Sequence, residues 1–271
     1  DVSYHVGGTF TYADNELVDR GGSGVLASGL RSDREGYPLR SVFGLRYCGK
    51  IQNEEQLEKY KNRYQETSQV GNIRVGDNMF EDVNGDGKLT AEDYVYLGTD
   101  DPKIQFSFNF GAEWKGFDVN FIFQGAGKRT VFRRQGNGGA DPWQIPMRAV
   151  YMNSSNHWVG DVWSPENPEG RYPSLTNTGD INNYNYQCSS WLVNDGSYLR
   201  LKNITLGYTM PKALLDKQKV LTNVRFYITG TDIWELTHIH DGWDPEAAST
   251  VSNMSRYPFN RTWTFGANLT F

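Results

Sequence analysis

Six segments of the chain alternate apolar with polar or small residues at the two-residue period of a β-strand that has one apolar face. In the clearest segment, Phe106, Phe108 and Phe110 alternate with polar or small residues. The pair Lys115-Gly116 follows this segment and predicts a tight hairpin turn, because glycine tolerates positive φ. The six predicted strands are residues 2–13, 103–114, 117–126, 197–210, 223–234 and 261–271.

Two local patterns refine this prediction. In the fourth strand the apolar positions change parity between Leu201 and Ile204, which predicts a β-bulge. Residues 53–63 are charged and have a helical pattern, so we expect a surface helix in the connection between the first two strands.

The connections between the strands alternate between short and long. The short ones are 115–116 and 211–223, whereas the long ones are 14–102, 128–196 and 235–258. Compact soluble domains rarely contain structureless connections of that length, but membrane β-barrels combine short periplasmic turns with long extracellular loops. The pattern therefore favours a membrane barrel over a soluble sandwich, in which the apolar faces pack on a second sheet.

Six strands cannot close such a barrel, since the smallest membrane barrels have about 8 strands. An open sheet would also leave unpaired backbone groups in lipid. We therefore expect a fragment, with the remaining strands supplied by an N-terminal portion or by another polypeptide. A first residue, Asp1, that enters a strand without signal-peptide features agrees with this expectation.

Composition narrows the function classes. The longest apolar run of the 271 residues has four members, so no transmembrane helix is expected. Aromatic residues make up 14% of the chain, which suits strands and the aromatic girdles of a barrel. A net charge of -5 offers no basic patch for nucleic acid. Cys48 and Cys188 either pair in an oxidising compartment or remain two free thiols.

Residues 82–93 fit the pattern of a calcium-binding loop. Asp82, Asn84 and Asp86 occupy loop positions one, three and five, with Gly87 at the sharp turn. Lys88 would offer its backbone carbonyl, and Asp93 closes the loop where Glu is usual. We expect structural Ca²⁺ here, with a metal-free turn rich in Asp and Asn as the alternative.

Other candidate sites are weaker. His238 and His240 share a strand face but lack further ligands at diagnostic spacing. The segment Gly21–Gly24 predicts a flexible loop. The stretch Asn182–Tyr186, with nearby tryptophans, would stack on sugar rings or pack within the loops; these tryptophans are Trp143, Trp158 and Trp163. We find no catalytic constellation and expect no enzyme.

Several runs occur in an order that is specific when they are taken together. These runs are Asp82–Gly87, Tyr96–Gly98 with Pro102, Phe110–Asp118, Trp163–Pro168, Arg171–Pro173, Gly196–Tyr208 with Pro211, Val224–Gly230, Asp244–Glu246 and Thr264–Phe271. The set resembles the SusC/RagA-like, TonB-dependent receptors of Bacteroidetes outer membranes. One departure is Asp232-Ile-Trp234, where this family usually has Asn-Leu.

The resemblance implies an all-β fold: the C-terminal strands of a transmembrane barrel of about 22 strands, with long extracellular loops. It also implies a bacterial outer-membrane location, with the C-terminus on the periplasmic side. The implied partners are the N-terminal remainder of the receptor with its plug, TonB acting through that missing part, a SusD-like surface lipoprotein and the lipid bilayer. The implied activity is import of oligosaccharides or peptides. It identifies no substrate-binding residues.

The competing interpretation is a secreted all-β binding module with a dockerin-like calcium loop. A dockerin normally carries a repeated loop, and one loop is found in this sequence. Detergent binding by the apolar strand faces distinguishes the two interpretations.

Overall fold

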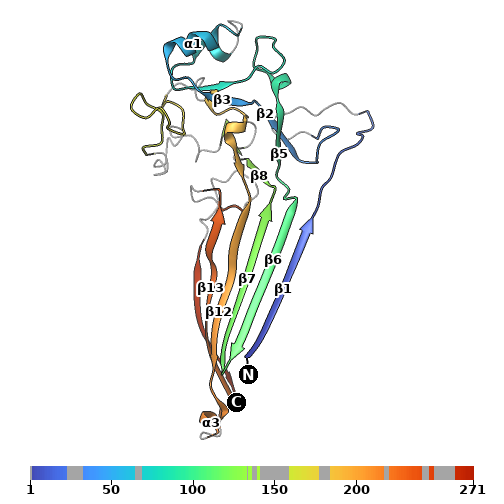
Figure 1. Cartoon of the computed structure of the whole chain (residues 1–271), viewed down its shortest axis with the longest axis vertical. Helices are drawn as coiled ribbons and strands as arrows, with labels where there is room; N and C mark the ends of the chain where they lie inside the picture. The colour runs from blue at the N-terminus through green and yellow to red at the C-terminus, as the bar shows by residue number, and fades with distance from the viewer. Residues whose placement is uncertain are drawn as a thin grey trace.

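The computed structural model describes residues 2–22, 33–64, 69–132, 134–135, 139–140, 159–176, 184–216, 220–239, 244–246 and 260–271. Its main feature is a six-stranded antiparallel sheet in the order β1-β6-β7-β12-β13-β14 (Figure 1). These strands are β1 (Val2–Tyr12), β6 (Ile104–Trp114), β7 (Phe117–Gly127), β12 (Tyr198–Thr209), β13 (Asn223–Thr237) and β14 (Thr262–Thr270).

The six strands lie where the alternation predicted them. Most of their ends agree within one residue, but β13 continues to Thr237 rather than ending at 234. The predicted bulge is confirmed, since the pairing of β12 with both of its neighbours shifts between Leu201 and Asn203. Lys115 and Gly116 both have positive φ, which is the geometry of the predicted tight turn between β6 and β7.

The two faces of the sheet differ in chemistry. Most apolar residues of the six strands fall on one face, with Ile122 and Ala126 of β7 among the exceptions. Many on the apolar face are exposed: Tyr4 is 76% exposed and Phe265 is 77% exposed. The opposite face carries the polar residues of the alternation, such as Ser107, Asn120 and Thr229. No second sheet covers the apolar face within the described residues, so this surface must meet a partner or an apolar medium.

Glycines on the polar face let neighbouring side chains lie flat across the sheet. Arg225 on β13 forms a bidentate ion pair with Asp118 on β7, at 2.6 and 2.9 Å, across the intervening β12. A Cβ atom at Gly207 of β12 would overlap both groups. The side chains of Asp118 and Arg225 therefore lie close to the backbone of β12 at this position.

Shorter elements fill the long connections and form a unit at one end of the sheet, which we call the head (Figure 1). It comprises the described residues between β1 and β6 and between β7 and β12. Its elements are β2 (Ser41–Gly44), β3 (Tyr47–Lys50), α1 (Glu54–Lys61), η1 (Gln69–Asn72), β4 (Asn78–Phe80), η2 (Ala91–Asp93), β5 (Val95–Thr99), β8 (Thr130–Phe132), β9 (Arg134–Gln135), β10 (Gly139–Ala140), η5 (Ser190–Leu192) and β11 (Val193–Asp195).

The long connections contain short strands that the alternation did not predict. The strands pair as β2-β5, β3-β4, β8-β11 and β9-β10, all antiparallel. The predicted surface helix is confirmed as α1, which the side chain of Asn53 caps by accepting a hydrogen bond from the Gln56 amide at 2.9 Å. The short connection 211–223 contains the helix α3 (Lys212–Leu215) at the opposite end of the sheet (Figure 1).

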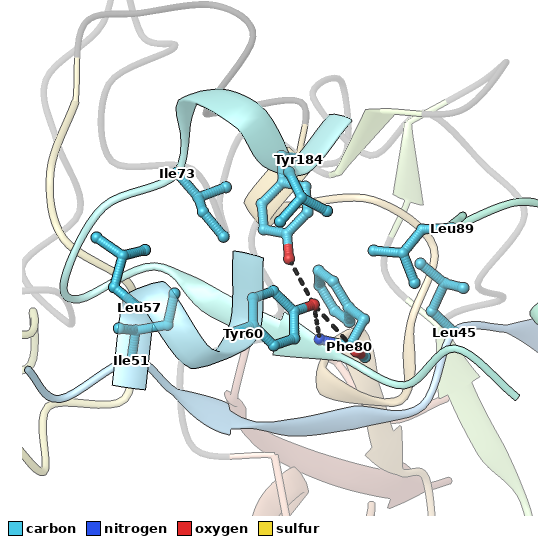
Figure 2. Close-up of a cluster of buried hydrophobic side chains, with 9 residues drawn as sticks. Leu45, Ile51, Leu57, Tyr60, Ile73, Phe80, Leu89 and Tyr184 are labelled. Carbon is cyan, nitrogen blue, oxygen red and sulfur yellow. Dashed lines mark hydrogen bonds between the residues drawn. The ribbon is translucent and has the colours of Figure 1, made fainter. Parts of the chain in front are cut away.

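One hydrophobic core joins the first two long connections, 14–102 and 128–196 (Figure 2). Phe80 and Tyr60 come from the first connection, whereas Tyr184 comes from the second. The Tyr60 hydroxyl lies 2.9 Å from the Tyr184 hydroxyl and donates to the Phe80 carbonyl, while the Phe80 amide donates to it at 2.8 Å. Burial raises the pKa of Tyr60, so this network stays neutral.

Polar contacts reinforce the same junction. Asp77 is fully buried and accepts hydrogen bonds from the Asn185 side chain and the Arg74 amide, each at 2.7 Å. Burial nevertheless raises the pKa of Asp77. A second core places Cys188 beneath β2, where its thiol donates to the Phe43 carbonyl at 2.9 Å. Cys48 is exposed and forms no disulfide with Cys188, so the disulfide alternative is not formed.

None of the described helices is long and apolar enough to cross a membrane.

The shared core makes a prediction about the head. Replacing Phe80 by Ala should lower the free energy of opening of the β3-β4 amides by about 3–5 kcal/mol, because the substitution leaves a cavity among aromatic rings. Amide hydrogen exchange on the intact protein measures this change. The Val18→Ala variant is the control, since Val18 is 80% exposed. Equal exchange in both variants would contradict the assignment of a packed head.

Candidate calcium loop and charged wall

Side-chain oxygens fold residues 82–88 into a tight loop. Both carboxylate oxygens of Asp82 accept backbone hydrogen bonds, from the Gly85 amide at 2.7 Å and from the Gly87 amide at 2.8 Å. Asn84 accepts from the Asp86 amide at 2.9 Å, and Asp86 accepts from the Lys88 amide at 2.8 Å. Gly85 and Gly87 have φ values of 76° and 75°, which this winding requires.

Asp93 closes the loop from its far end. Its side chain is fully buried and accepts from the amides of Val83 at 2.9 Å and Thr90 at 2.8 Å. Thr90 and Asp93 also form a reciprocal capping box on η2. The residue at the twelfth loop position therefore ties the two ends of the loop together.

The loop gathers part of a calcium ligand set. Asp82, Asn84 and Asp86 present oxygens from a single turn, and each carboxylate oxygen that accepts one hydrogen bond keeps a further lone pair. Among the described residues, however, no three His, Cys, Asp or Glu side chains converge closely enough to hold a metal by themselves. The fit therefore depends on the Asn84 side chain and backbone carbonyls such as that of Lys88, and Ca²⁺ stays a prediction.

The described members of the weaker sequence candidates are not brought together into a site. His238 is exposed and lies 3.3 Å from Asp195, while His240 lies outside the described residues. Tyr184 and Tyr186 are buried in the head rather than available for stacking on sugars. Trp163 is largely buried and donates to the Gln52 side chain at 2.9 Å. Ser23, Gly24, Trp143, Trp158, Asn182 and Asn183 lie outside the described residues.

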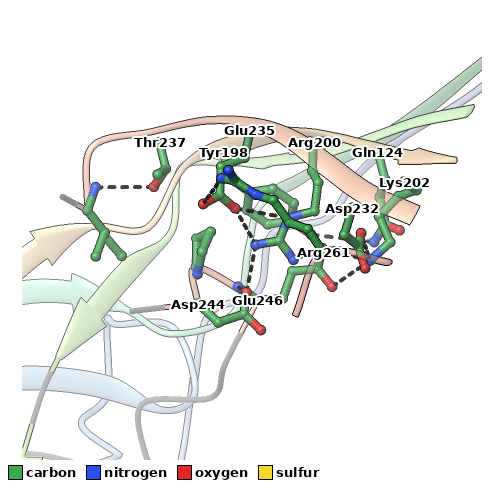
Figure 3. Close-up of polar contacts among 12 residues, drawn as sticks. Gln124, Tyr198, Arg200, Lys202, Asp232, Glu235, Thr237, Asp244, Glu246 and Arg261 are labelled. Atoms are coloured by element: carbon green, nitrogen blue, oxygen red, sulfur yellow. Dashed lines mark hydrogen bonds and ion pairs between the residues drawn. The ribbon is translucent and has the colours of Figure 1, made fainter. Parts of the chain in front are cut away.

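The structure adds a charged cluster that no pattern in the sequence indicated. Arg200 of β12 is only 1% exposed at its side chain and lies on the polar face (Figure 3). Its guanidinium contacts Glu235 of β13 at 2.6 Å, Asp244 at 2.8 Å and Glu246 at 2.8 Å. We call the contact of Arg200 with Asp244 and Glu246 the clasp.

Further charges surround the clasp. Lys202, the extra residue where β12 pairs with β7, lies 2.9 Å from Asp232 and 3.1 Å from Glu246. Asp232 has a φ of 55°, a strained value for a residue other than glycine. Arg261 of the chain leading into β14 lies 3.8 Å from Glu235. Charge pairing in this cluster offsets the cost of burying Arg200, which is large for an unpaired ion.

The clasp attaches the connection between β13 and β14 to the polar face of the sheet. Asp244 and Glu246 belong to that connection, and the carbonyl between them, at Pro245, accepts a hydrogen bond from Arg129. Burial lowers the pKa of Arg129, whose guanidinium also donates to the Asp100 carbonyl at 3.0 Å. The signal in the sequence was an arginine at a polar strand position together with a separate acidic pair, but nothing in the sequence indicates that they meet.

Comparisons with known proteins agree on one family. No family model matches the chain. A TonB-dependent receptor of Formosa agariphila is 30% identical over 95% of this chain, and a second from the same bacterium is 28% identical over 95%. The TonB-dependent receptor SusC of Bacteroides thetaiotaomicron is 22% identical over 72% of the chain. The aligned parts make up 26%, 25% and 18% of these relatives.

Solved structures show the same fold. The RagAB peptide transporter superposes with a TM-score of 0.72 over all of this chain and 27% of that chain, at 21% identity. The RagAB peptide importer in a closed state gives a TM-score of 0.70 at 20% identity. The expected fold, strands of a large β-barrel, is thereby confirmed. The chain is a homologue of the SusC/RagA-like TonB-dependent receptors and corresponds to about a quarter of such a receptor.

Proposed function

We propose that the chain supplies barrel wall and outer loops to a TonB-dependent importer of the bacterial outer membrane. The observation that carries this proposal is the two-faced sheet, whose apolar face is exposed along all six strands. A barrel places such a face against lipid and the polar face against its lumen. The homology to TonB-dependent receptors supports the same function.

The positions of the connections support an orientation in the membrane. The head lies at one end of the sheet, and the tight turn, α3 and both chain termini lie at the other (Figure 1). Outer-membrane barrels have long extracellular loops and short periplasmic turns. The head is therefore extracellular and the C-terminus periplasmic.

The partners follow from the family. The remainder of the receptor completes the barrel, and TonB acts through a segment outside this chain. A SusD-like lipoprotein covers the head, as the kinship with SusC and the likeness to RagAB suggest. The cargo is an oligosaccharide or a peptide; RagAB itself is described as a peptide transporter.

We also propose that Ca²⁺ binds the loop at Asp82, Asn84, Asp86, the Lys88 carbonyl and Asp93. Its oxygen ligands and the turn that the loop already forms support this proposal. The ion would have a structural role, which is to fix the chain between β4 and β5 in the head.

The membrane proposal predicts a difference between two neighbouring substitutions on β14. Phe265→Arg places a charge on the apolar face and should reduce the amount of assembled receptor, because arginine facing lipid costs about 2–4 kcal/mol at the midplane. Thr264→Arg, on the polar face, should assemble normally. Folded receptor is quantified in isolated outer membranes. Equal assembly would contradict a lipid-facing sheet, since a soluble protein tolerates either change at an exposed site.

The partner proposal predicts a complex. Native mass spectrometry of the protein extracted from membranes in mild detergent should show the completed receptor together with a lipoprotein. The identity of each subunit is read from its mass after dissociation. A detergent-free species near 30.8 kDa would instead favour a secreted calcium-binding module.

The calcium proposal predicts stabilisation by the ion. Adding Ca²⁺ to chelator-treated receptor should stabilise the head by about 2.7 kcal/mol at a hundredfold excess over Kd. The double variant Asp82→Asn, Asp86→Asn should lose this response, whereas Glu58→Gln on the exposed surface of α1 should keep it. Hydrogen exchange of head amides provides the measurement, and an unchanged response in the double variant would exclude this loop as the site.

A further inference from the structure

A pocket of about 490 Å³ opens on the polar face where the sheet meets the head. Its floor is at Ala126 of β7, which pairs with Gln105 on one side and Tyr198 on the other. The small alanine between two large side chains creates the hollow. A volume of this size matches a small-molecule site.

Neutral polar groups supply most of the free hydrogen-bonding capacity of this pocket. Gln105 and Gln124 are exposed on neighbouring strands, and Thr9 and Ser107 form a hydroxyl pair at 2.7 Å. The Gln124 amide contacts the Tyr198 hydroxyl at 3.4 Å (Figure 3). Gln105 makes no side-chain hydrogen bond to the described residues. Carboxamides and hydroxyls donate and accept at the same site.

The charged groups at the rim of the pocket are engaged with the protein. Glu246 is held by Arg200 at 2.8 Å and by Lys202 at 3.1 Å. Arg129 donates to the carbonyls of Asp100 and Pro245. A charged ligand would have to compete with these contacts, whereas a neutral ligand leaves them intact.

We propose that this pocket is a contact site for neutral oligosaccharide cargo. The inference rests on the proposed import function and adds a location and a ligand class. Sugar hydroxyls both donate and accept, so they match the carboxamides of Gln105 and Gln124 and the hydroxyls of Thr9 and Ser107. Arg200 acts as a positioning residue, because the clasp holds Glu246 at the edge of the pocket.

The position of Glu246 predicts that the pocket prefers neutral sugars to acidic ones. Its carboxylate lies at the edge of the pocket and repels a like charge. Because Arg200 and Lys202 pair with Glu246 and the Arg129 guanidinium also lines the pocket, we expect acidic sugars to bind more weakly than neutral ones rather than to be excluded. Removing this negative charge leaves Lys202 and Arg200 with one carboxylate fewer and favours an acidic sugar.

Binding to the intact receptor tests the site. The probes are maltoheptaose, cellohexaose, laminarihexaose, xylohexaose and mannohexaose, with oligogalacturonate as the acidic sugar and a tryptic casein digest as the peptide probe. At least one neutral oligosaccharide should bind by calorimetry. The double variant Gln105→Leu, Gln124→Leu should weaken that binding about tenfold or more, the equivalent of about 1.4 kcal/mol. Asn268→Leu, on the polar face of β14 away from the pocket, should bind normally.

Selectivity tests the role of Glu246. The Glu246→Gln variant should gain affinity for oligogalacturonate relative to the neutral sugar. Arg200→Lys should also lower the preference for the neutral sugar over oligogalacturonate, because one ammonium group cannot hold Glu235, Asp244 and Glu246 together, and it should keep the membrane assembly of the parent protein.

Three results would overturn the inference. No neutral probe binds, the double variant Gln105→Leu, Gln124→Leu binds the neutral sugar like the parent, or only the peptide digest binds. Native mass spectrometry in detergent distinguishes failure of this inference from failure of the import proposal. The double variant Gln105→Leu, Gln124→Leu should still form the receptor complex even though its sugar binding is weakened.

Discussion

The structure depends on the alternation of side chains along its six long strands. Each strand can satisfy its backbone only by pairing with neighbours, and pairing fixes every second side chain on the same face. In this chain one of those faces is apolar and uncovered, as the exposure of Tyr4 and Phe265 shows. Among the residues that the structure describes, the packed cores therefore lie in the head and not on the sheet.

The wall itself is held by contacts that run across strands rather than between layers. The Asp118–Arg225 pair passes over Gly207, and Arg200 ties β12 to β13 and to the connection beyond it. Such contacts lie flat on the sheet and leave space on its polar side. A two-layer protein fills that space with a second set of side chains.

Local pattern was sufficient to predict the strands, because period-two alternation and turn chemistry act within a few residues. The parity change between Leu201 and Ile204 even located the bulge. The head was not predictable in the same way. Its core joins Tyr60 to Tyr184, and the clasp joins Arg200 to Glu246, so both depend on contacts between distant segments. The calcium loop was recognisable because its residues are contiguous, although the closing hydrogen bonds of Asp93 were not.

The shared core of the head has a consequence for the order of folding. Tyr184 is separated from Tyr60 by 124 positions, and the β6-β7 hairpin lies between them in the chain. Closing so long a loop costs chain entropy unless the intervening segment is already compact. Forming the hairpin first brings the two connections to the same end of the sheet and shortens the effective loop. We therefore expect the core of the head to form after the strands of the sheet have paired.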